Sequence, residues 1–315
     1  MLAKFPVIVG PTAGGKTGLS IALAHRLNAD GQGPAEVVSA DSMQIFRGMD
    51  VGTAKPTEDE RDGIPHHLLD VVEPTESFSV DRWLTLAEAA IADIRARGGT
   101  PIVVGGTHLY TKALLEGLFE GPEADEAIRE ELASMPPDAR RAELERIDPD
   151  AAARIHPNDD RRTIRALEVF RLTGRPISEW QRQWDTGKVR EDALLVGLVW
   201  PTEAINGRIN QRVRQMVDEG LFEEVEGLVK AGRLGPQAAE ALGYKQVLPV
   251  IDGRASREDA TERIKIETRR FAKNQRTWLR RLRATPGSLW LEPGTTDLEA
   301  MVDAVICRLD AAGAS

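Results

Sequence analysis

The feature that most constrains the fold is a glycine-rich octapeptide near the start of the chain. Residues 10–17 read GPTAGGKT and fit the pattern G-x-x-x-x-G-K-[ST]. They follow an apolar segment, residues 5–9, that we predict to be a buried strand, and they lead into a predicted helix over residues 17–27. Such a turn directs backbone N–H groups and the positive end of a helix at a phosphate. Because both flanking elements are present, a chance match in an ordinary turn is the less favoured interpretation.

Each part of the octapeptide has an expected role toward a phosphate ligand. Lys16 would neutralise phosphate charge, and the hydroxyl of Thr17 would ligate Mg²⁺. Backbone amides would supply the remaining contacts. The predicted phosphate-binding residues of the loop are Gly10, Thr12, Ala13, Gly14, Gly15, Lys16 and Thr17.

A carboxylate follows the second predicted strand, residues 36–39. Asp41 lies two positions past the end of this strand, at the edge where α/β folds bind ligands. The later predicted strands, 101–104 and 194–200, do not end in the aspartate that holds Mg²⁺ in many nucleotide hydrolases. From its position alone, Asp41 is a candidate metal ligand or general base. A solvated loop carboxylate or a helix cap is the structural alternative.

Apolar strands alternating with helices, such as the one predicted over residues 79–97, indicate a parallel sheet with both faces covered. The segment 121–187 is instead polar, charged and broken by prolines, so we interpret it as a helical insertion, and the chain after residue 200 as helical. The predicted fold is therefore α/β: a P-loop NTPase-like parallel sheet flanked by helices, with an inserted helical domain. The core would comprise residues 1–120 and 188–315.

Composition limits the class of protein. The single cysteine, Cys307, excludes a disulfide framework and a cysteine-based zinc site within one chain, which suits a reducing compartment. The N-terminus lacks the basic and apolar pattern of a signal peptide, and the longest apolar stretch, residues 193–200, is far too short to span a bilayer. We expect a cytoplasmic protein that contacts no membrane.

The net charge of −9 opposes binding of nucleic acid, but the charges are sorted along the chain. Residues 263–283 contain nine Lys or Arg and one acid. Helical spacing places five of these cations on one stripe: Arg269, Lys273, Arg276, Arg280 and Arg283. An offset apolar stripe would pack: Ile264, Phe271, Trp278 and Leu282. A stripe of one sign repels itself unless a polyanion meets it, so we favour RNA contact over a solvated charged face. A second basic group lies in the insertion: Arg161, Arg162 and Arg165.

Two further pairs of residues have competing interpretations. His66 and His67 are adjacent, so on a strand they point to opposite faces, and a packing or loop-fixing role is favoured over joint metal binding. Arg208 and Arg212 are spaced i, i+4 and share one face of a predicted helix. For these arginines an exposed salt-bridging role is the alternative to ligand binding.

An ordered set of motifs gives the chain a specific resemblance. The set continues from the octapeptide through residues 41–44, 48–56, 63–68, 105–110, 154–159, 164–169, 243–245 and 272–278. In this order the motifs resemble those of bacterial tRNA dimethylallyltransferases, also called isopentenyl-tRNA transferases, and they cover nearly the whole chain. The resemblance implies that N6 of adenosine 37, beside the anticodon of tRNAs that read codons starting with U, attacks dimethylallyl diphosphate and releases diphosphate.

The resemblance also implies roles for individual residues. Asp41 would be the general base, Lys16 and Arg212 would bind the diphosphate with the loop, and Thr107 would contact the diphosphate or the target nucleotide. The residues expected to contact tRNA are Asp41, Ser42, Met43, Gln44, Thr107, Arg129, Arg161, Arg162, Arg165, Lys245, Lys273, Arg276 and Arg280. Mg²⁺ is the expected cofactor, dimethylallyl diphosphate and tRNA are the expected substrates, and a monomer is the expected state.

Three other functions are weighed against this one. A small-molecule kinase would use the same loop with ATP, but it leaves the basic stripe unexplained. An adenylate isopentenyltransferase, acting on a free nucleotide, leaves the helical insertion unexplained. An RNA-binding GTPase-like module would need a guanine-reading N-K-x-D segment, which the sequence lacks.

Overall fold

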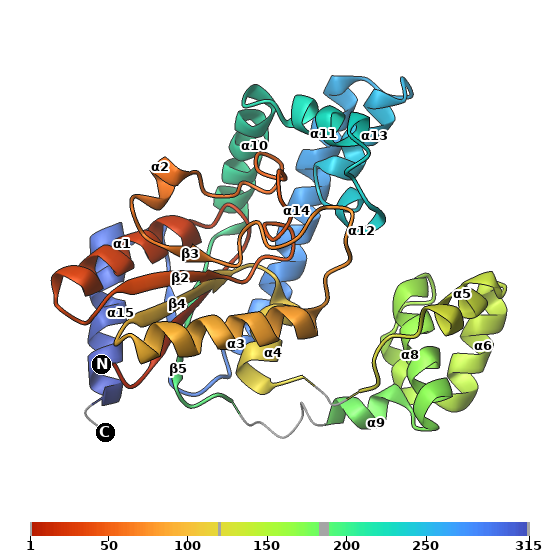
Figure 1. Cartoon of the computed structure of the whole chain (residues 1–315), viewed down its shortest axis with the longest axis horizontal. Helices are drawn as coiled ribbons and strands as arrows, with labels where there is room; N and C mark the ends of the chain where they lie inside the picture. The colour runs from red at the N-terminus through yellow and green to blue at the C-terminus, as the bar shows by residue number, and fades with distance from the viewer. Residues whose placement is uncertain (1, 119–120, 183–188, 314–315) are drawn as a thin grey trace. The chain divides into compact units, whose positions relative to one another are not determined.

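The computed structural model describes residues 2–118, 121–182 and 189–313 (Figure 1). It divides into two compact units. The first, here the core unit, comprises Met1–Leu115 and Arg190–Ser315, and the second, here the insertion unit, comprises Glu116–Val189. The sequence-based ranges were 1–120 with 188–315 for the core and 121–187 for the insertion.

The core unit is built on a parallel sheet of six strands in the order β3-β2-β4-β1-β5-β6. The strands are β1 Phe5–Val9, β2 Ala35–Ser39, β3 His66–His67, β4 Thr100–Gly105, β5 Ala193–Leu198 and β6 Leu289–Leu291. β1 is central, because Val7 pairs with Val103 on one side and with Leu195 on the other. All five residues of β1 are buried, as expected for a strand covered on both faces.

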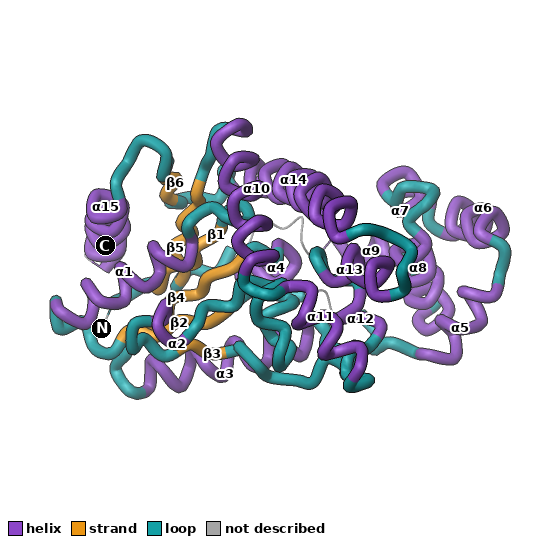
Figure 2. The backbone as a smooth tube through the Cα atoms, turned by 90° about the horizontal axis from the view of Figure 1, so that it is seen from above, coloured by secondary structure: helices purple, strands orange, loops and turns teal. Residues whose placement is uncertain are grey.

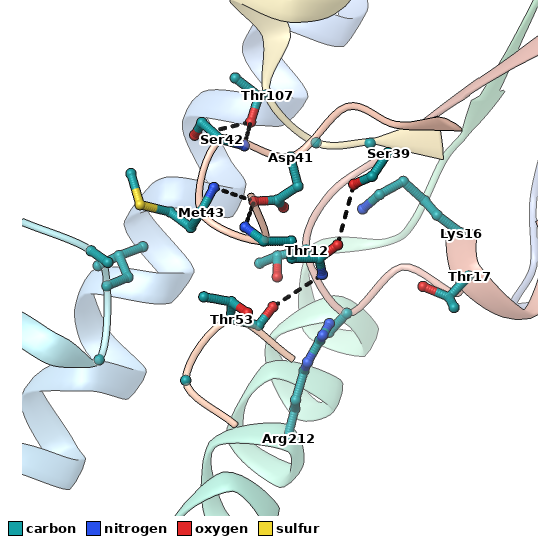
Figure 3. Close-up of a pocket in the computed structure, with 18 of the residues that line it drawn as sticks. Thr12, Lys16, Thr17, Ser39, Asp41, Ser42, Met43, Thr53, Thr107 and Arg212 are labelled. Atoms are coloured by element: carbon teal, nitrogen blue, oxygen red, sulfur yellow. Dashed lines mark hydrogen bonds between the residues drawn. The ribbon is translucent and has the colours of Figure 1, made fainter. Parts of the chain in front are cut away.

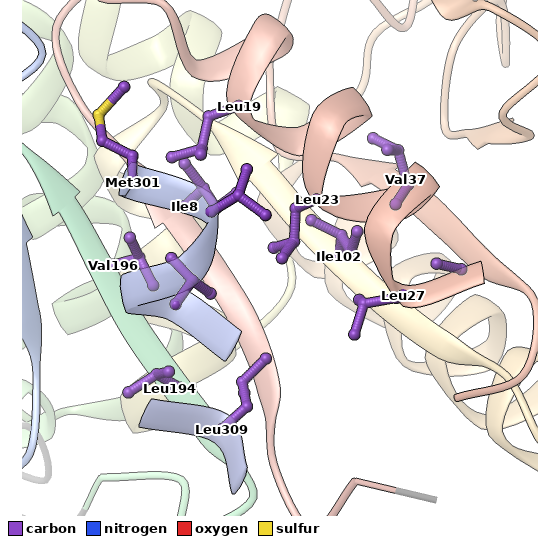
Figure 4. Close-up of a cluster of buried hydrophobic side chains, with 14 of the residues drawn as sticks. Ile8, Leu19, Leu23, Leu27, Val37, Ile102, Leu194, Val196, Met301 and Leu309 are labelled. Atoms are coloured by element: carbon purple, nitrogen blue, oxygen red, sulfur yellow. The ribbon is translucent and has the colours of Figure 1, made fainter. Parts of the chain in front are cut away.

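Helices cover both faces of this sheet (Figures 1 and 2). On one face α1 (Lys16–Ala29) packs beside α15 (Leu298–Gly313), and their apolar side chains meet those of the strands in the main core (Figure 4). On the other face α3 (Val80–Ala96) packs on β2 and β4. Ser79 caps α3 by accepting a hydrogen bond from the N–H of Arg82 at 3.1 Å, which fixes where this helix begins.

The face covered by α3 also sets the end of β2. The indole N–H of Trp83 donates to the carbonyl oxygen of Ser39 at 3.0 Å, and its ring stacks on Tyr110 of α4 (His108–Glu116) with centroids 4.5 Å apart. Both rings are buried. The packing of α3 and α4 therefore holds the segment that leads directly into Asp41.

Four helices form an array with the long helix α14, Arg257–Leu282: α10 Thr202–Asp218, α11 Leu221–Lys230, α12 Pro236–Ala239 and α13 Tyr244–Ile251. The short helix α2, Glu58–Arg61, lies instead in the connection between β2 and β3. α14 packs against α10 and α13, and α11 packs against α13. No helix within the three described ranges is long and apolar enough to cross a membrane.

The insertion unit consists, over its described residues, of helices with a core of their own. The helices are α5 Glu126–Ser134, α6 Pro137–Ile147, α7 Pro149–Arg154, α8 Asp160–Thr173 and α9 Ile177–Gln181. Leu132, Leu144 and Leu167 are fully buried in one apolar cluster formed by this unit alone. A helical insertion is what the proline-broken polar segment predicted.

The predicted fold class is confirmed, with one correction in the C-terminal part. Residues after 200 are not all helical, because Leu289–Leu291 forms β6 and pairs in parallel with β5. This strand has only three residues between Gly287 and Pro293, so no alternating pattern marks it. Its pairing partner, residues 196–198, is far away in sequence.

Candidate active site

The glycine-rich loop connects β1 to α1 at the carboxyl edge of the sheet. Gly15 adopts a φ of 87° and precedes α1, and no side chain caps this helix start. At Gly14 a Cβ atom would lie 2.7 Å from the carbonyl oxygen of Pro11, so the tight turn requires glycine. The N–H groups of the first helical turn thus face an open site and are suited to an anion.

Lys16 bends back over this loop. Its ammonium group donates to the carbonyl oxygens of Gly10 at 3.1 Å and Pro11 at 2.9 Å. Burial, and next the positive charge of Arg212, lower the pKa of Lys16 to about 8, while the charge of Asp41 partly opposes the shift. The site therefore holds two cations close together, and an anionic ligand would reduce the repulsion between them.

Asp41 lies just past β2, and its two carboxylate oxygens have different surroundings (Figure 3). Oδ1 accepts the backbone N–H of Met43 at 2.9 Å and that of Gln44 at 3.4 Å. Among the described residues Oδ2 has no hydrogen-bond partner, and Asp41 lines a cavity that Lys16 and Thr107 also line. The turn therefore occupies one carboxylate oxygen and leaves the other available for chemistry.

Thr107 contacts Ser42, the residue after Asp41, from the end of the neighbouring strand β4. It follows β4, and its hydroxyl oxygen accepts the backbone N–H of Ser42 at 3.0 Å and lies 3.3 Å from the Ser42 hydroxyl. The two strand ends approach closely, because a Cβ on Gly105 would lie 2.1 Å from the carbonyl oxygen of Ala40. The carboxyl ends of adjacent parallel strands meet at one edge of the sheet, which explains why two distant motifs form one site.

Two cavities meet at the glycine-rich loop. The first, about 370 Å³, is lined by polar groups and by apolar residues, which include Val37, Val104, Ile209, Val213, Ile264 and Phe271. The second, about 610 Å³, lies between the loop, residues 50–57 and α10. Residues that line both are Ala13, Lys16, Thr17, Pro56, Arg212 and Met216. Lys16, Thr17 and Arg212 thus surround the junction, where a diphosphate could meet both spaces.

Of the two arginines on α10, Arg212 has the position expected of a ligand-binding residue. Figure 3 shows it extending from the helix toward the cavity, and it is half-buried. Burial lowers its pKa, yet a guanidinium stays charged in proteins. Arg208 lines only the second cavity, donates to the carbonyl oxygen of Ala13 at 2.7 Å and lies 4.8 Å over the ring of Trp200. Arg208 therefore stabilises the glycine-rich loop.

Sequence reasoning missed Gln275 as a site residue. Its side-chain oxygen accepts the backbone N–H of Thr12 at 2.8 Å, and its side-chain nitrogen donates to the carbonyl oxygen of Gly106 at 3.0 Å. The residue is only 3% exposed. It links α14 to the glycine-rich loop and to the turn before Thr107. The available signal was a polar residue on the side of α14 that otherwise buries apolar residues such as Ile264 and Leu282.

The predicted five-cation stripe on α14 is wrong in part. Lys273 and Arg280 are exposed and, within the described part of the chain, have no ion-pair partner. Arg269, however, donates to Asn210 at 2.5 Å and Arg276 to Thr202 at 2.6 Å, both toward α10, and Arg283 lies 5.3 Å over the ring of Trp290.

Helix α10 covers the side of α14 that carries Arg269 and Arg276. The cations that stay exposed therefore lie on a different side of α14 from the predicted stripe. This face, here the α14 cationic face, consists of exposed side chains that have no ion-pair partner in the described part of the chain: Arg263, Arg270, Lys273, Arg280 and Arg281. Phe271, which was predicted to pack, is 37% exposed and lines the first cavity. Periodicity alone gives the stripes but not which flank a neighbouring helix covers.

Most predicted RNA-contacting residues outside α14 have protein partners. In the insertion unit Arg129 and Arg165 pair at 2.9 and 2.6 Å with Glu168, which is fully buried. Burial alone would raise the pKa of Glu168, but hydrogen bonds from Arg165, the N–H of Asp125 and Arg129 hold that pKa below its usual value. These two arginines therefore stabilise the unit.

The other three cations predicted to contact RNA outside α14 are closer to solvent. Arg162 pairs with Asp159 at 2.8 Å, whereas Arg161 is exposed and, among the described residues, unpaired. In the core unit Lys245 pairs with Glu267 at 3.2 Å and is 37% exposed. These three cations remain accessible to a polyanion.

The two histidines fix local structure, as predicted. His66 Nδ1 lies 2.8 Å from the carbonyl oxygen of Ile64, and His67 Nε2 lies 2.6 Å from the carboxylate of Glu36. Burial lowers the pKa of His66. Within the described residues no group of three or more His, Cys, Asp or Glu side chains is arranged to hold a metal. The exposed Thr17, which borders both cavities, suits a cation held mainly by ligand oxygens and water.

Comparison with known proteins gives consistent matches. A family model described as IPP transferase matches residues 44–282. The tRNA dimethylallyltransferase of Geobacillus thermodenitrificans is 48% identical over 285 residues, covering 89% of this chain and 88% of that protein. The tRNA dimethylallyltransferase of Geobacillus kaustophilus is 49% identical over the same shares of the two chains.

Solved structures agree with the sequence matches. A tRNA isopentenylpyrophosphate transferase from Bacillus halodurans superposes with a TM-score of 0.71 at 40% identity, over 98% of each chain. A eukaryotic dimethylallyltransferase acting on tRNA superposes with a TM-score of 0.77 at 32% identity, over 94% of this chain and 75% of that one.

Proposed function

Because the chain belongs to the IPP transferase family, we propose that it transfers a dimethylallyl group from dimethylallyl diphosphate to N6 of adenosine 37 in tRNAs that read codons starting with U. The products are N6-dimethylallyladenosine and diphosphate. The observation that carries this assignment is the placement of Asp41 Oδ2, Lys16 and Arg212 around one cavity with an apolar wall. Such a cavity suits a substrate with a charged head and a hydrocarbon tail.

The glycine-rich loop, Lys16 and Arg212 would hold the diphosphate. In the reaction N6 forms a bond to C1 of the dimethylallyl group while the bond from C1 to the diphosphate oxygen breaks, and the electron pair leaves with the diphosphate. Negative charge therefore grows on the leaving group, and the loop N–H groups, Lys16 and Arg212, which line the adjoining cavities, would stabilise it. Thr17 would help to hold Mg²⁺, which would supply further positive charge for the diphosphate.

Asp41 would take the proton that N6 loses. An exocyclic amine is a weak nucleophile, so a base that accepts its proton lowers the barrier. Oδ2 is the oxygen available for this, because Oδ1 is occupied by the turn. Thr107, which accepts the Ser42 N–H, lines the same cavity as Asp41 and would contact the diphosphate or the target nucleotide.

The RNA would lie on cationic surfaces of both units. The α14 cationic face and Arg161 are suited to phosphates, since phosphate contacts supply much of the affinity for nucleic acid. The target base must leave its stack to reach Asp41, as it does for other enzymes that act on a base. We also propose that the protein acts as a monomer in the cytoplasm. Thr17 would contact Mg²⁺ directly, and tRNA would contact Ser42, Met43 and Gln44.

Isotope transfer tests the proposal. Labelled dimethylallyl diphosphate should mark unmodified tRNA, whereas AMP and small acceptors should stay unlabelled and γ-labelled ATP should mark nothing. The variant Asp41→Asn keeps an oxygen for the Met43 N–H but removes the base, so kcat should fall by about 100-fold or more with little change in KM for the diphosphate substrate. Transfer from ATP alone, or full speed in Asp41→Asn, would contradict the assignment.

A further inference from the structure

A carboxylate remote from the reaction centre binds the backbone of a loop that borders both cavities. Glu224, on α11, accepts the N–H groups of three consecutive residues: Asp50 at 2.8 Å and Val51 at 2.7 Å through Oε2, and Gly52 at 3.0 Å through Oε1. Hydrogen bonds to a charged acceptor are about twice as strong as neutral ones. Three of them on one side chain strongly constrain the loop.

Tyr244 completes this contact. Its hydroxyl donates to Oε1 of Glu224, and its side chain is fully buried. Burial and the charge of Glu224 raise the pKa of Tyr244, so the phenol stays protonated and acts as a donor. A Cβ on Gly52 would lie 2.4 Å from the Tyr244 ring, so the loop backbone lies directly on this ring. Glu224 and Tyr244 thus form one docking point for the loop.

The docked segment, residues 50–56, is part of the wall of both cavities. Gly52 and Thr53 border the first cavity, residues 50, 51, 54 and 55 border the second, and Pro56 borders both. Glu224 borders neither. Its effect on a ligand must therefore act through the loop.

The same segment contacts two proposed substrate-binding residues. The carbonyl oxygen of Ala54 accepts from the side-chain amide of Gln44 at 3.1 Å and from the guanidinium of Arg212 at 3.5 Å. The carbonyl oxygen of Thr53 also accepts from the Gln44 amide, at 3.2 Å. A shift of the loop would move these carbonyls and with them the guanidinium at the cavity junction.

We propose that Glu224, together with Tyr244, is a positioning residue that holds residues 50–54 in the shape that aims Arg212 at the diphosphate. The inference rests on the proposed function for the identity of that anion. It predicts a specific defect in diphosphate binding from a change at a residue that touches no substrate.

The test compares three variants. Glu224→Gln replaces one carboxylate oxygen by an NH₂ group, which faces N–H or O–H donors and cannot accept from them. The variant should bind inorganic diphosphate about tenfold or more weakly. Its kcat/KM for dimethylallyl diphosphate should fall by a similar factor. Tyr244→Phe removes one donor and should weaken binding about threefold. Glu223→Gln is the matched control and should change neither quantity, because the Glu223 carboxylate pairs with Arg257 at 2.8 Å near the surface.

Calorimetric diphosphate affinity separates positioning from a structural role. Loss of folded protein alone would reduce the number of binding sites and kcat but leave Kd and KM of the folded fraction unchanged, and that result would overturn the proposal. If Glu224→Gln does not fold, Tyr244→Phe decides, and wild-type affinity in that variant would equally overturn it. If the wild type binds diphosphate without prenylating tRNA, the proposed function fails, while weaker binding by Glu224→Gln still supports the positioning role.

Discussion

The ammonium group of Lys16 shares its site with the guanidinium of Arg212. Burial and this second cation lower the pKa of Lys16 to about 8, from an ordinary value of 10.5. A bound diphosphate would supply opposite charge and raise that pKa again. In the complex Lys16 therefore keeps a proton that it loses near pH 8 when the site is free. We expect diphosphate affinity to fall as the pH rises above that value.

Calorimetry measures this linkage directly. Titration of dimethylallyl diphosphate in buffers of different ionisation enthalpy should show proton uptake that is small at pH 7 and grows toward pH 9. The variant Lys16→Arg is the control, because its side chain stays charged over this range, and it should show less uptake. Equal uptake in the two proteins would mean that Lys16 does not carry the effect.

At the scale of elements, the structure divides the cations of α14 into two groups. Arg270 belongs to the exposed α14 cationic face, whereas its neighbour Arg269 donates to Asn210 on α10. Replacing Arg270 by Gln should weaken tRNA binding and reduce the slope of log K against log salt by about 1. Replacing Arg269 by Gln should leave that slope unchanged and lower the melting temperature, because it removes a contact between helices.

Filter binding at several salt concentrations, with thermal unfolding alongside, distinguishes the two variants. The pair is matched, since both remove one arginine from adjacent positions of the same helix. If the Arg269 variant lowered the salt slope and the Arg270 variant left it unchanged, Arg269 rather than Arg270 would contact tRNA. That result would support the stripe predicted from helical spacing.

Local parts of the structure could be predicted from the sequence, whereas contacts between distant helices and loops could not. The strand, glycine-rich loop and α1 depend on neighbouring residues, so pattern and spacing predict them. The carboxyl ends of parallel strands share one edge of the sheet, and Asp41 and Lys16 line one cavity there. The hydrogen bond from Thr12 to Gln275 joins residues 263 positions apart, and Glu224 binds a loop that lies 172 to 174 positions away. Such partners depend on how helices pack, which local periodicity does not encode.

At the scale of the whole molecule, the insertion unit leaves and rejoins the core at neighbouring points. The N–H of Arg190 donates to the carbonyl oxygen of Leu115 at 2.7 Å, so the two ends of the core chain already meet. The insertion unit buries its own apolar cluster, and the sheet, both cavities and Gln275 lie in the core unit. A core in which a short Gly-Ser linker replaces residues 117–188 should therefore fold.

This shortened protein separates the two substrates. It should bind dimethylallyl diphosphate with wild-type affinity, because every residue proposed to hold the diphosphate is retained. It should bind tRNA at least about tenfold more weakly, because the cations of the insertion unit are gone and each lost phosphate contact removes counterion release. Calorimetry with the small substrate and filter binding with tRNA measure the two affinities. Unchanged tRNA affinity would remove the insertion unit from RNA binding, and loss of diphosphate affinity in a folded core would show that the phosphate site depends on that unit.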